Sequence, residues 1–136
     1  MPSNEEIVRA AYAAAERPLD VEGFINLFAE DGYLYDVSAG KKYHGREVGD
    51  LVTGFDASFP DLRRKLDKFY VDGNVVVVEL SLNGTHTGPL ETPNGTVPAS
   101  GKKIEAPCCD VWTLKDTKIQ SFHCYMAATI LAAQIK

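Results

Sequence analysis

Two residues near the end of the chain are spaced to exchange a proton. The run DVWTLKDTKIQSFHCY (110–125) has the pattern of two antiparallel strands joined by a turn centred on Asp116-Thr117. Asp110 and His123 lie equally far from this turn, so an uninterrupted hairpin pairs them directly. A carboxylate beside an imidazole fixes the ring's tautomer and raises its basicity, which suits a general base. The sequence therefore predicts a catalytic pair of Asp110 and His123.

The same pair also has a structural interpretation. An Asp–His contact between strands can be a satisfied polar contact that only fixes the register. A bulge in either strand would remove the pairing altogether. Both interpretations stay open at the level of the sequence.

Period-two alternation predicts which side chains share a sheet face with Asp110. In an uninterrupted hairpin this face holds Ile104, Ala106, Cys108, Asp110, Trp112 and Leu114, opposite Ile119, Ser121, His123, Tyr125 and Ala127. The other face then holds Glu105, Cys109, Val111, Thr113, Gln120, Phe122, Cys124 and Met126. Because the first face carries a Trp and a Tyr but no Lys or Glu, we expect it to be concave, with Trp112 and Tyr125 contacting a ligand.

The three cysteines give a weaker signal. Cys108 could act as a nucleophile beside His123, although a buried cysteine is more often an inert apolar side chain. Cys109 and Cys124 would face each other on the outer side and could bridge under oxidation. An odd number of cysteines without metal-type spacing favours reduced thiols, so we expect neither a disulfide framework nor a metal site.

The first half of the chain predicts three helices. Ser3 and Glu6 have capping-box spacing and open a helix that ends by Pro18. Asp20 is a candidate N-cap of a second, short helix. A strand at 32–38 follows an acidic turn at 30–32, and an apolar stripe over 48–59 predicts the third helix.

The second half changes to strand periodicity. We expect strands near 62–71, 75–86, 103–114 and 118–127, with a turn at Asp72-Gly73 and a helical tail over 128–136. Three prolines and three glycines at 88–101 predict a long loop that can act as a lid. Helices early and antiparallel strands late indicate one α+β domain in which a curved sheet wraps over helices. His86 shares parity with buried strand residues and can point into the cavity, although bonding to loop backbone is at least as expected.

Composition excludes several classes of partner. The net charge is -5 at pH 7, and basic residues cluster only at Arg63, Arg64 and Lys65, so we expect neither nucleic acid nor a membrane as partner. Apolar runs such as Val75–Val78 are far too short to span a bilayer. An acidic start, unlike a signal peptide, predicts a cytoplasmic protein.

Four segments carry a family resemblance that covers most of the chain. The runs YHGRE (43–47), ASFPDL (57–62), NGTHTGPL (83–90) and DTKIQSFHCYMAATILAAQ (116–134) resemble the SnoaL-like polyketide cyclases. These belong to the nuclear transport factor 2-like superfamily, which includes ketosteroid isomerase, scytalone dehydratase and limonene epoxide hydrolase. The resemblance implies a cone-shaped barrel, in which a curved, mainly antiparallel sheet wraps over about three N-terminal helices.

The chain departs from that family at its acid/base position. The resemblance puts the family's aspartate at Ala127, and His123 where a Trp is common. Alanine cannot transfer a proton, so either the family reaction is absent or another group has taken the role. Asp110 and His123 are the expected substitutes.

The resemblance also implies pocket contacts elsewhere. Tyr35 and Asp36 fall where superfamily pockets often carry Tyr or Asp, although Asp36 could equally cap the following turn. Tyr12 and Phe55 are more often core residues, but in a cone-shaped barrel the core also lines the pocket. We expect all four as substrate contacts beside Cys108.

Three functions remain open. The first is a cofactor-independent cyclase, isomerase or dehydratase acting on an apolar, polyketide-like or aromatic carbonyl compound, with a hydroxyl of Tyr35 or Tyr125 stabilising the enolate oxygen. Ketosteroid isomerase, a known example of such chemistry in an apolar site, shows the logic on this fold. The second is a binding protein for a small hydrophobic or aromatic molecule. The third is an assembly role, in which Val111, Phe122, Cys124 and Met126 bury against a second copy to form a homodimer.

Overall fold

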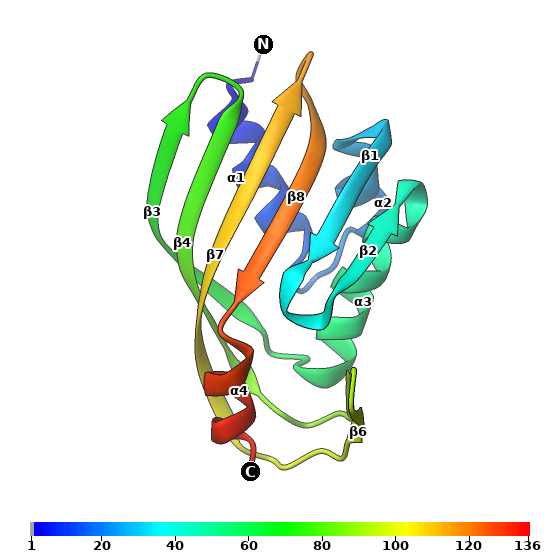
Figure 1. The fold of residues 1–136 in the computed structure, drawn as a ribbon, viewed down its shortest axis with the longest axis vertical. Helices are drawn as coiled ribbons and strands as arrows, with labels where there is room; N and C mark the ends of the chain where they lie inside the picture. Colours follow the sequence, from blue (N-terminus) through cyan, green and yellow to red (C-terminus); the bar gives the residue numbers. More distant parts are fainter. Residues whose placement is uncertain (1) are drawn as a thin grey trace.

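The computed structural model describes residues 2–136 and has a curved six-stranded sheet at its centre (Figure 1). The strand order is β2-β1-β8-β7-β4-β3, so β2 and β3 form the two edges and the sheet stays open. Neighbouring strands are antiparallel except β1 and β8, which are parallel. The six strands are β1 (Phe28–Asp36), β2 (Lys41–His44), β3 (Arg63–Asp72), β4 (Val75–Thr85), β7 (Lys103–Lys115) and β8 (Lys118–Met126).

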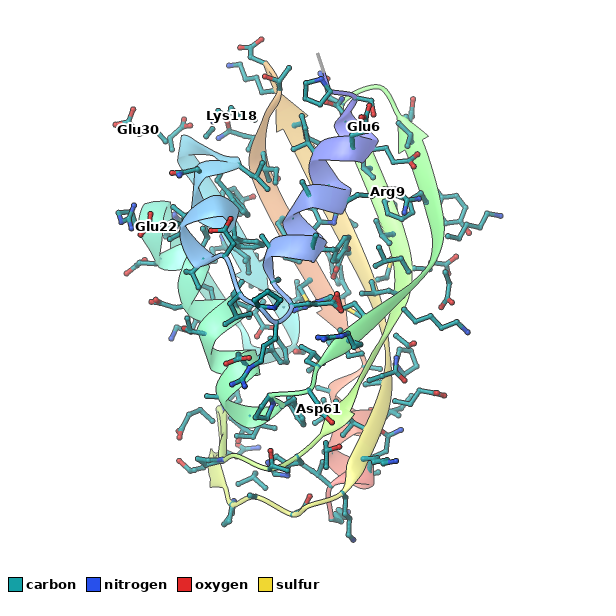
Figure 2. All side chains as sticks on the ribbon, turned by 180° about the vertical axis from the view of Figure 1, so that it is seen from behind. Glu6, Arg9, Glu22, Glu30, Asp61 and Lys118 are labelled. Atoms are coloured by element: carbon teal, nitrogen blue, oxygen red, sulfur yellow. The ribbon has the colours of Figure 1, made fainter. Side chains whose placement is uncertain are left out.

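Three helices cover one face of this sheet, as the sequence predicts: α1 (Asn4–Ala14), α2 (Val21–Asn26) and α3 (Val48–Ser58). Figure 2 shows them from behind, with the charged side chains of Glu6 and Arg9 on the outside of α1. The capping box forms: the Glu6 amide donates to the Ser3 hydroxyl, and the Ser3 amide donates to the Glu6 carboxylate. Asp20 caps α2 by accepting from the Gly23 amide at 2.9 Å.

Strand β1 begins earlier than predicted. The acidic segment 30–32, expected as a turn, lies within β1. Phe28 pairs with Ile119 and Tyr33 with Ser121, so β1 carries additional residues between two pairs of a continuous β8. This irregularity keeps the polar segment at the sheet surface while the strand continues.

The predicted lid segment contains a small hairpin, β5 (Leu90–Thr92) and β6 (Gly95–Val97), below the main sheet in Figure 1. Its start packs tightly on the end of α3, since a Cβ at Gly88 would lie 1.9 Å from the Ala57 carbonyl oxygen. Two short 3-10 turns, η1 (Val37–Ala39) and η2 (Gly45–Glu47), flank β2. The predicted helical tail is α4 (Ala128–Gln134), which is tied to β7 by hydrogen bonds between Gln134 and the Glu105 backbone.

The core lies between the concave face of the sheet and the three N-terminal helices. Trp112 is 1% exposed, and its ring stacks on Phe122 with centroids 3.8 Å apart. Tyr12 meets the same indole edge-on, with ring centroids 5.4 Å apart. Within residues 2–136, no helix is long and apolar enough to cross a bilayer.

Candidate active site

The register of the β7–β8 hairpin differs by one residue from the predicted one. Near the turn the prediction holds: Lys115 pairs with Lys118, and the turn residues Asp116 and Thr117 have φ of 51° and 64°, as a tight two-residue hairpin requires. Leu114 then pairs with Ile119 but Thr113 pairs with Ser121. Gln120 is therefore the extra residue of a β-bulge.

The bulge separates the predicted catalytic pair. Asp110 pairs with Cys124, and His123 pairs with Val111. Since side chains alternate across a strand, Asp110 points into the core while His123 points to the opposite face. The predicted contact between Asp110 and His123 is wrong, because pattern counting assumed an uninterrupted strand.

Beyond the bulge, the two faces of β8 are exchanged relative to the prediction. Phe122 and Cys124 are buried, and Tyr125 is 47% exposed instead of lining the pocket. The predicted pairing of Cys109 with Cys124 is also wrong, because Cys109 pairs with Tyr125. The β7 residues on the concave face, and Ile119 before the bulge, lie where the alternation predicts: Ile104, Ala106, Cys108, Asp110, Trp112, Leu114 and Ile119.

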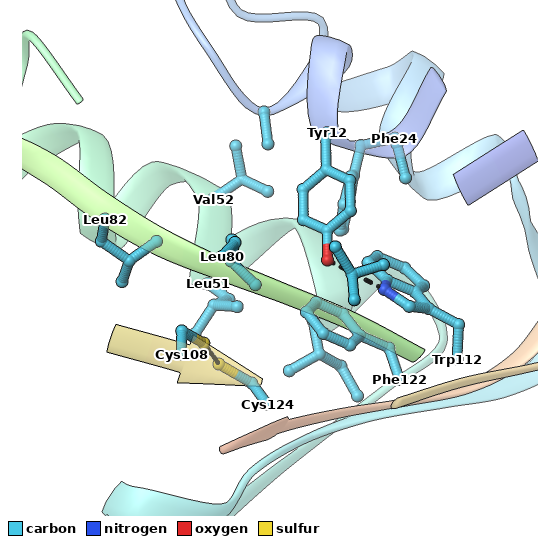
Figure 3. Packing of buried hydrophobic residues seen from close by; sticks show 14 of the residues in the cluster. Tyr12, Phe24, Leu51, Val52, Leu80, Leu82, Cys108, Trp112, Phe122 and Cys124 are labelled. Carbon is cyan, nitrogen blue, oxygen red and sulfur yellow. Dashed lines mark hydrogen bonds between the residues drawn. The ribbon is translucent and has the colours of Figure 1, made fainter. Parts of the chain in front are cut away.

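Asp110 lies on the wall of an internal cavity and is 2% exposed. Its Oδ2 accepts a hydrogen bond of 2.7 Å from the Tyr12 hydroxyl, and its Oδ1 one of 3.2 Å from the Cys108 thiol. The Tyr12 oxygen in turn accepts from Trp112 Nε1 at 3.0 Å, the contact drawn in Figure 3. One strand, β7, thus supplies the thiol, the carboxyl and the indole at alternate positions, and α1 supplies the hydroxyl.

The cavity around this network is small. Its volume is about 20 Å³, which is room for about one water molecule. Its apolar walls come from α2, α3 and the sheet: Phe24, Leu51, Val52, Phe55, Leu82 and Phe122. Tyr12, Cys108, Trp112 and Phe55, predicted as ligand contacts, all lie in this lining.

Burial and hydrogen bonding set the protonation of the cavity groups. Loss of solvation raises the pKa of Asp110, against the hydrogen bonds from Tyr12 and Cys108 and the positive charge of Arg64. Burial also raises the pKa of Tyr12, and the adjacent Asp110 charge adds to the effect. The hydrogen bond with Cys108 and then burial raise the pKa of Cys124. At neutral pH the phenol and the Cys124 thiol are therefore protonated.

His123 belongs to a different group of side chains on the convex face. Its Nε2 lies 2.9 Å from the Tyr33 hydroxyl, and its ring contacts Tyr35 edge-on with centroids 5.6 Å apart. Tyr125 lies beside it, with ring centroids 6.4 Å apart. We call Tyr33, Tyr35, His123 and Tyr125 the outer aromatic cluster. Tyr35, predicted to contact substrate beside Asp36, therefore lies on the side of the sheet away from the cavity.

His86 and Asp36 are buried but lie outside the cavity lining. His86 Nδ1 accepts from the Ser100 amide at 3.1 Å and contacts the Ser100 hydroxyl at 2.9 Å. His86, directly after β4, thus ties this strand to the end of the loop that carries β5 and β6. Of its two predicted roles, the structure shows the bond to the loop backbone and not a place in the cavity lining. Asp36 accepts from the Ser38 hydroxyl at 3.0 Å, so it stabilises the turn after β1.

Sequence reasoning missed two polar groups of the cavity. Cys124 was assigned to the outer face because the bulge at Gln120 leaves no clear mark in the pattern. Arg64 pairs with the inward-facing Leu82, and its guanidinium donates to the Ala15 carbonyl at 3.1 Å while lining the cavity. The alternation Leu62, Arg64, Leu66, which runs into β3, was the available signal, masked by the basic neighbours Arg63 and Lys65.

Solved structures share this architecture. A protein from Catenulispora acidiphila with a ketosteroid isomerase-like fold, in complex with trimethylamine, superposes with a TM-score of 0.81 at 22% identity, covering 98% of this chain and 94% of that one. A protein from Jannaschia sp. CCS1 assigned as a SnoaL-like polyketide cyclase gives 0.85 at 19% identity, covering 97% and 90%. IdmH from Streptomyces antibioticus, assigned as a polyketide cyclase, gives 0.81 at 18% identity, covering 98% of each chain. At such identities the likeness establishes the fold.

Sequence comparison adds the family. No curated protein sequence matches the chain. The model of the SnoaL-like domain matches residues 8–122, which include most of α1, all of α2, α3 and β7, and the first part of β8. The chain belongs to the SnoaL-like domain family.

Proposed function

We propose that this protein is a small acid–base enzyme of the cyclase, isomerase or dehydratase type, which acts on an apolar carbonyl compound and uses Asp110 to transfer a proton. One observation carries the proposal: Asp110 is the one carboxyl group in the lining of the cavity, among the residues that the structure describes. A buried carboxylate between apolar walls is a far stronger base than one in water. Asp110 would then take the role of the family's acid/base aspartate, whose position is occupied by Ala127 in this chain.

The hydrogen-bond network gives Tyr12 a role in the same step. While Asp110 is ionised, the Tyr12 hydroxyl donates to it. When Asp110 takes a proton from the carbon next to the carbonyl, the new acid can donate to the Tyr12 oxygen, which frees the Tyr12 hydrogen for the enolate oxygen. Tyr12 thus replaces Tyr35 and Tyr125, which lie on the other face of the sheet.

The size of the cavity sets a condition on substrate binding. Pockets for drug-sized ligands hold roughly 300–1,000 Å³, far more than the 20 Å³ found beside Asp110. A polyketide-like or aromatic substrate therefore requires the half-buried Phe55 and Arg64 to move outward. We infer that the structure is the closed, resting form.

The small cavity and Ala127 also favour the alternative, a non-catalytic binding protein for a small hydrophobic molecule. Exchange of hydrogen for deuterium next to a carbonyl distinguishes the two, because it reports proton transfer without knowledge of the natural reaction. We would incubate 2-tetralone with the protein in D₂O and follow loss of its α-proton signals by NMR. In a separate sample in H₂O, the single tryptophan, Trp112, reports binding independently through its indole N–H signal.

The enzyme hypothesis predicts exchange well above the buffer rate, and a loss of about 10²- to 10⁴-fold in Asp110→Asn. A shift of the Trp112 signal without exchange would instead support the binding protein. Equal exchange rates for wild type and Asp110→Asn would contradict the assignment of Asp110.

A homodimer is a further part of the proposal. The outer aromatic cluster leaves Tyr125 47% exposed, and the half-buried Val111 lies next to it on the convex face. Phe122, Cys124 and Met126, also predicted for this surface, lie on the core side of β8 and do not belong to it. Light scattering at micromolar concentration is expected to give twice the mass of 14.9 kDa, and a monomer would contradict the dimer. A cytoplasmic location remains a prediction.

A further inference from the structure

Three buried side chains of the concave face converge on one point. The Sγ atoms of Cys108 and Cys124 and a carboxylate oxygen of Asp110 all lie within 4.8 Å of one another. Asp110 and Cys124 are direct partners across β7 and β8, and Cys108 precedes Asp110 by two positions on the same face. The close-up in Figure 3 shows the two sulfur atoms facing each other. We propose that Cys108, Asp110 and Cys124 form a binding site for a thiophilic divalent ion of the zinc type.

The distance between the sulfur atoms fits an ion. It is 3.7 Å, and two thiolates on a tetrahedral Zn²⁺ with bonds of about 2.3 Å lie about 3.8 Å apart. Cys108 Sγ and Asp110 Oδ1 are 3.2 Å apart, slightly closer than the corresponding edge of such a site. These two distances need only small side-chain shifts, and the third, between Cys124 Sγ and a carboxylate oxygen of Asp110, is within 4.8 Å. Thiolate and carboxylate are both established zinc ligands.

The backbone geometry disfavours the other chemistry of two adjacent thiols, a disulfide. Cys108 pairs with Met126, so Cys108 and Cys124 are diagonal neighbours across the hairpin. Diagonal Cα atoms are typically about 7–8 Å apart, beyond the range of up to about 7 Å that a disulfide bridges without backbone movement. A bound ion can span the longer gap because two sulfur–metal bonds replace the single sulfur–sulfur bond of a disulfide.

The surroundings suit an ion with one open coordination position. Three protein ligands leave the fourth position of a tetrahedral ion free, the arrangement of catalytic rather than structural zinc sites. The cavity of about 20 Å³ beside them has room for one water there. Two thiolates and a carboxylate around a divalent ion leave one negative charge, and the Arg64 guanidinium in the same lining offsets it.

Cobalt(II) is a suitable probe because its spectrum reports both ligand type and geometry. We would titrate the reduced 136-residue chain with Co²⁺ and record the sulfur-to-metal charge-transfer band and the visible bands of tetrahedral cobalt. We would then displace the cobalt with Zn²⁺. The expected result is one ion per chain with thiolate coordination. A spectrum of octahedral cobalt without a thiolate band, or no binding, would overturn the proposal.

The chain offers a matched control in Cys109, which neighbours Cys108 but lies on the convex face and pairs with Tyr125. Cys108→Ser, Cys124→Ser and Asp110→Asn are each expected to weaken Co²⁺ binding about 100-fold or more, and Cys109→Ser to leave it unchanged. Equal weakening by Cys109→Ser would overturn the site. If the variants at the buried positions fail to fold, the wild-type and Cys109→Ser spectra still test the site. A thiolate band of equal strength in both supports it, and no thiolate band in wild type overturns it.

This site shares Asp110 with the proposed proton transfer but does not depend on it, since the titration needs no turnover. If both proposals hold, added Zn²⁺ binds the Asp110 carboxylate and keeps it from accepting a proton. Zn²⁺ then lowers the α-proton exchange rate of 2-tetralone in wild type and in Cys109→Ser alike. If only the metal site holds, cobalt binds although no exchange occurs at any metal concentration.

Discussion

The two faces of the β7–β8 hairpin differ in how they satisfy their polar groups. On the concave face, the Asp110 carboxylate is 2% exposed, and its partners are the fixed Tyr12 hydroxyl and the Cys108 thiol. On the convex face, the half-buried His123 contacts the Tyr33 hydroxyl and two further tyrosine rings, one of them largely exposed. A polar group without water depends on each of its partners, whereas a group at the surface can exchange a partner for solvent. Chemistry that needs a perturbed carboxylate therefore belongs to the concave face.

The largest expected effect tests the bulge that separates these faces. Deleting Gln120 removes the extra residue, so the pairs on either side of the bulge become consecutive and the later side chains of β8 stay on their present faces of the sheet. We expect this deletion to lower the free energy of unfolding by about 2 kcal/mol or less. Deleting His123 instead turns Cys124 outward and Tyr125 into the core, and we expect a loss above about 4 kcal/mol or no folded protein. Urea unfolding of both variants measures the difference. Equal losses would show that the strand has no bulge at Gln120.

Truncating one aromatic residue on each face gives the next largest contrast. Phe122 is 5% exposed and stacks on Trp112, so Phe122→Ala is expected to lower the free energy of unfolding by about 3–5 kcal/mol. Tyr125→Ala on the convex face is expected to cost about 1 kcal/mol or less. Denaturant midpoints of the two variants provide the measurement. A larger loss for Tyr125→Ala than for Phe122→Ala would contradict the bulge and support an uninterrupted register, with Tyr125 on the concave face.

Removing one hydroxyl from each face sharpens the comparison further. Tyr12→Phe takes a donor from Asp110 and an acceptor from Trp112 Nε1, both buried, and is expected to cost about 2–3 kcal/mol. In Tyr33→Phe, water can replace the lost partner of His123, so we expect about 0.5–1 kcal/mol. Thermal and urea unfolding measure both losses. Similar values would mean that the Tyr12 network is solvated.

The smallest effect concerns an exposed carboxylate, Asp61, labelled in Figure 2. The hydroxyl and the amide of Thr85 each donate to it at 2.7 Å, and these bonds lower the pKa of Asp61. A lowered folded-state pKa gives stability that is present above the unfolded pKa of about 3.9 and is lost as pH falls through the folded value. Asp61→Asn should cost less than about 1 kcal/mol at pH 7, and this difference should shrink below about pH 4. A difference that grows in acid would contradict the sign of the shift.

Much of the fold could be predicted from the sequence because its signals are local. The capping box at Ser3, the helical stripe of 48–59 and the turn at Asp116-Thr117 depend on neighbouring residues, and all three are confirmed. The early start of β1 and the hairpin in 88–101 were missed, because pairing with a distant strand or a short β-bridge leaves little periodicity.

The candidate site divides in the same way. The concave face of β7 follows from alternation within one strand, so Asp110, Cys108 and Trp112 were placed correctly. The cross-strand partner of Asp110 was predicted wrongly, because the extra residue Gln120 moves every later side chain of β8 to the opposite face of the sheet. Tyr12 was named as a pocket residue, but its contact with Asp110 joins α1 to β7 and lies beyond any local pattern.

The most direct test sets Asp110 against His123 in one assay of 2-tetralone α-proton exchange. If Asp110 on the concave face transfers the proton, as proposed, Asp110→Asn should lose about 10²- to 10⁴-fold in exchange rate. His123 lies on the convex face, so His123→Gln should keep the wild-type rate within about twofold. A large loss in His123→Gln, with Asp110→Asn unaffected, would contradict the assignment of the active site to the concave face.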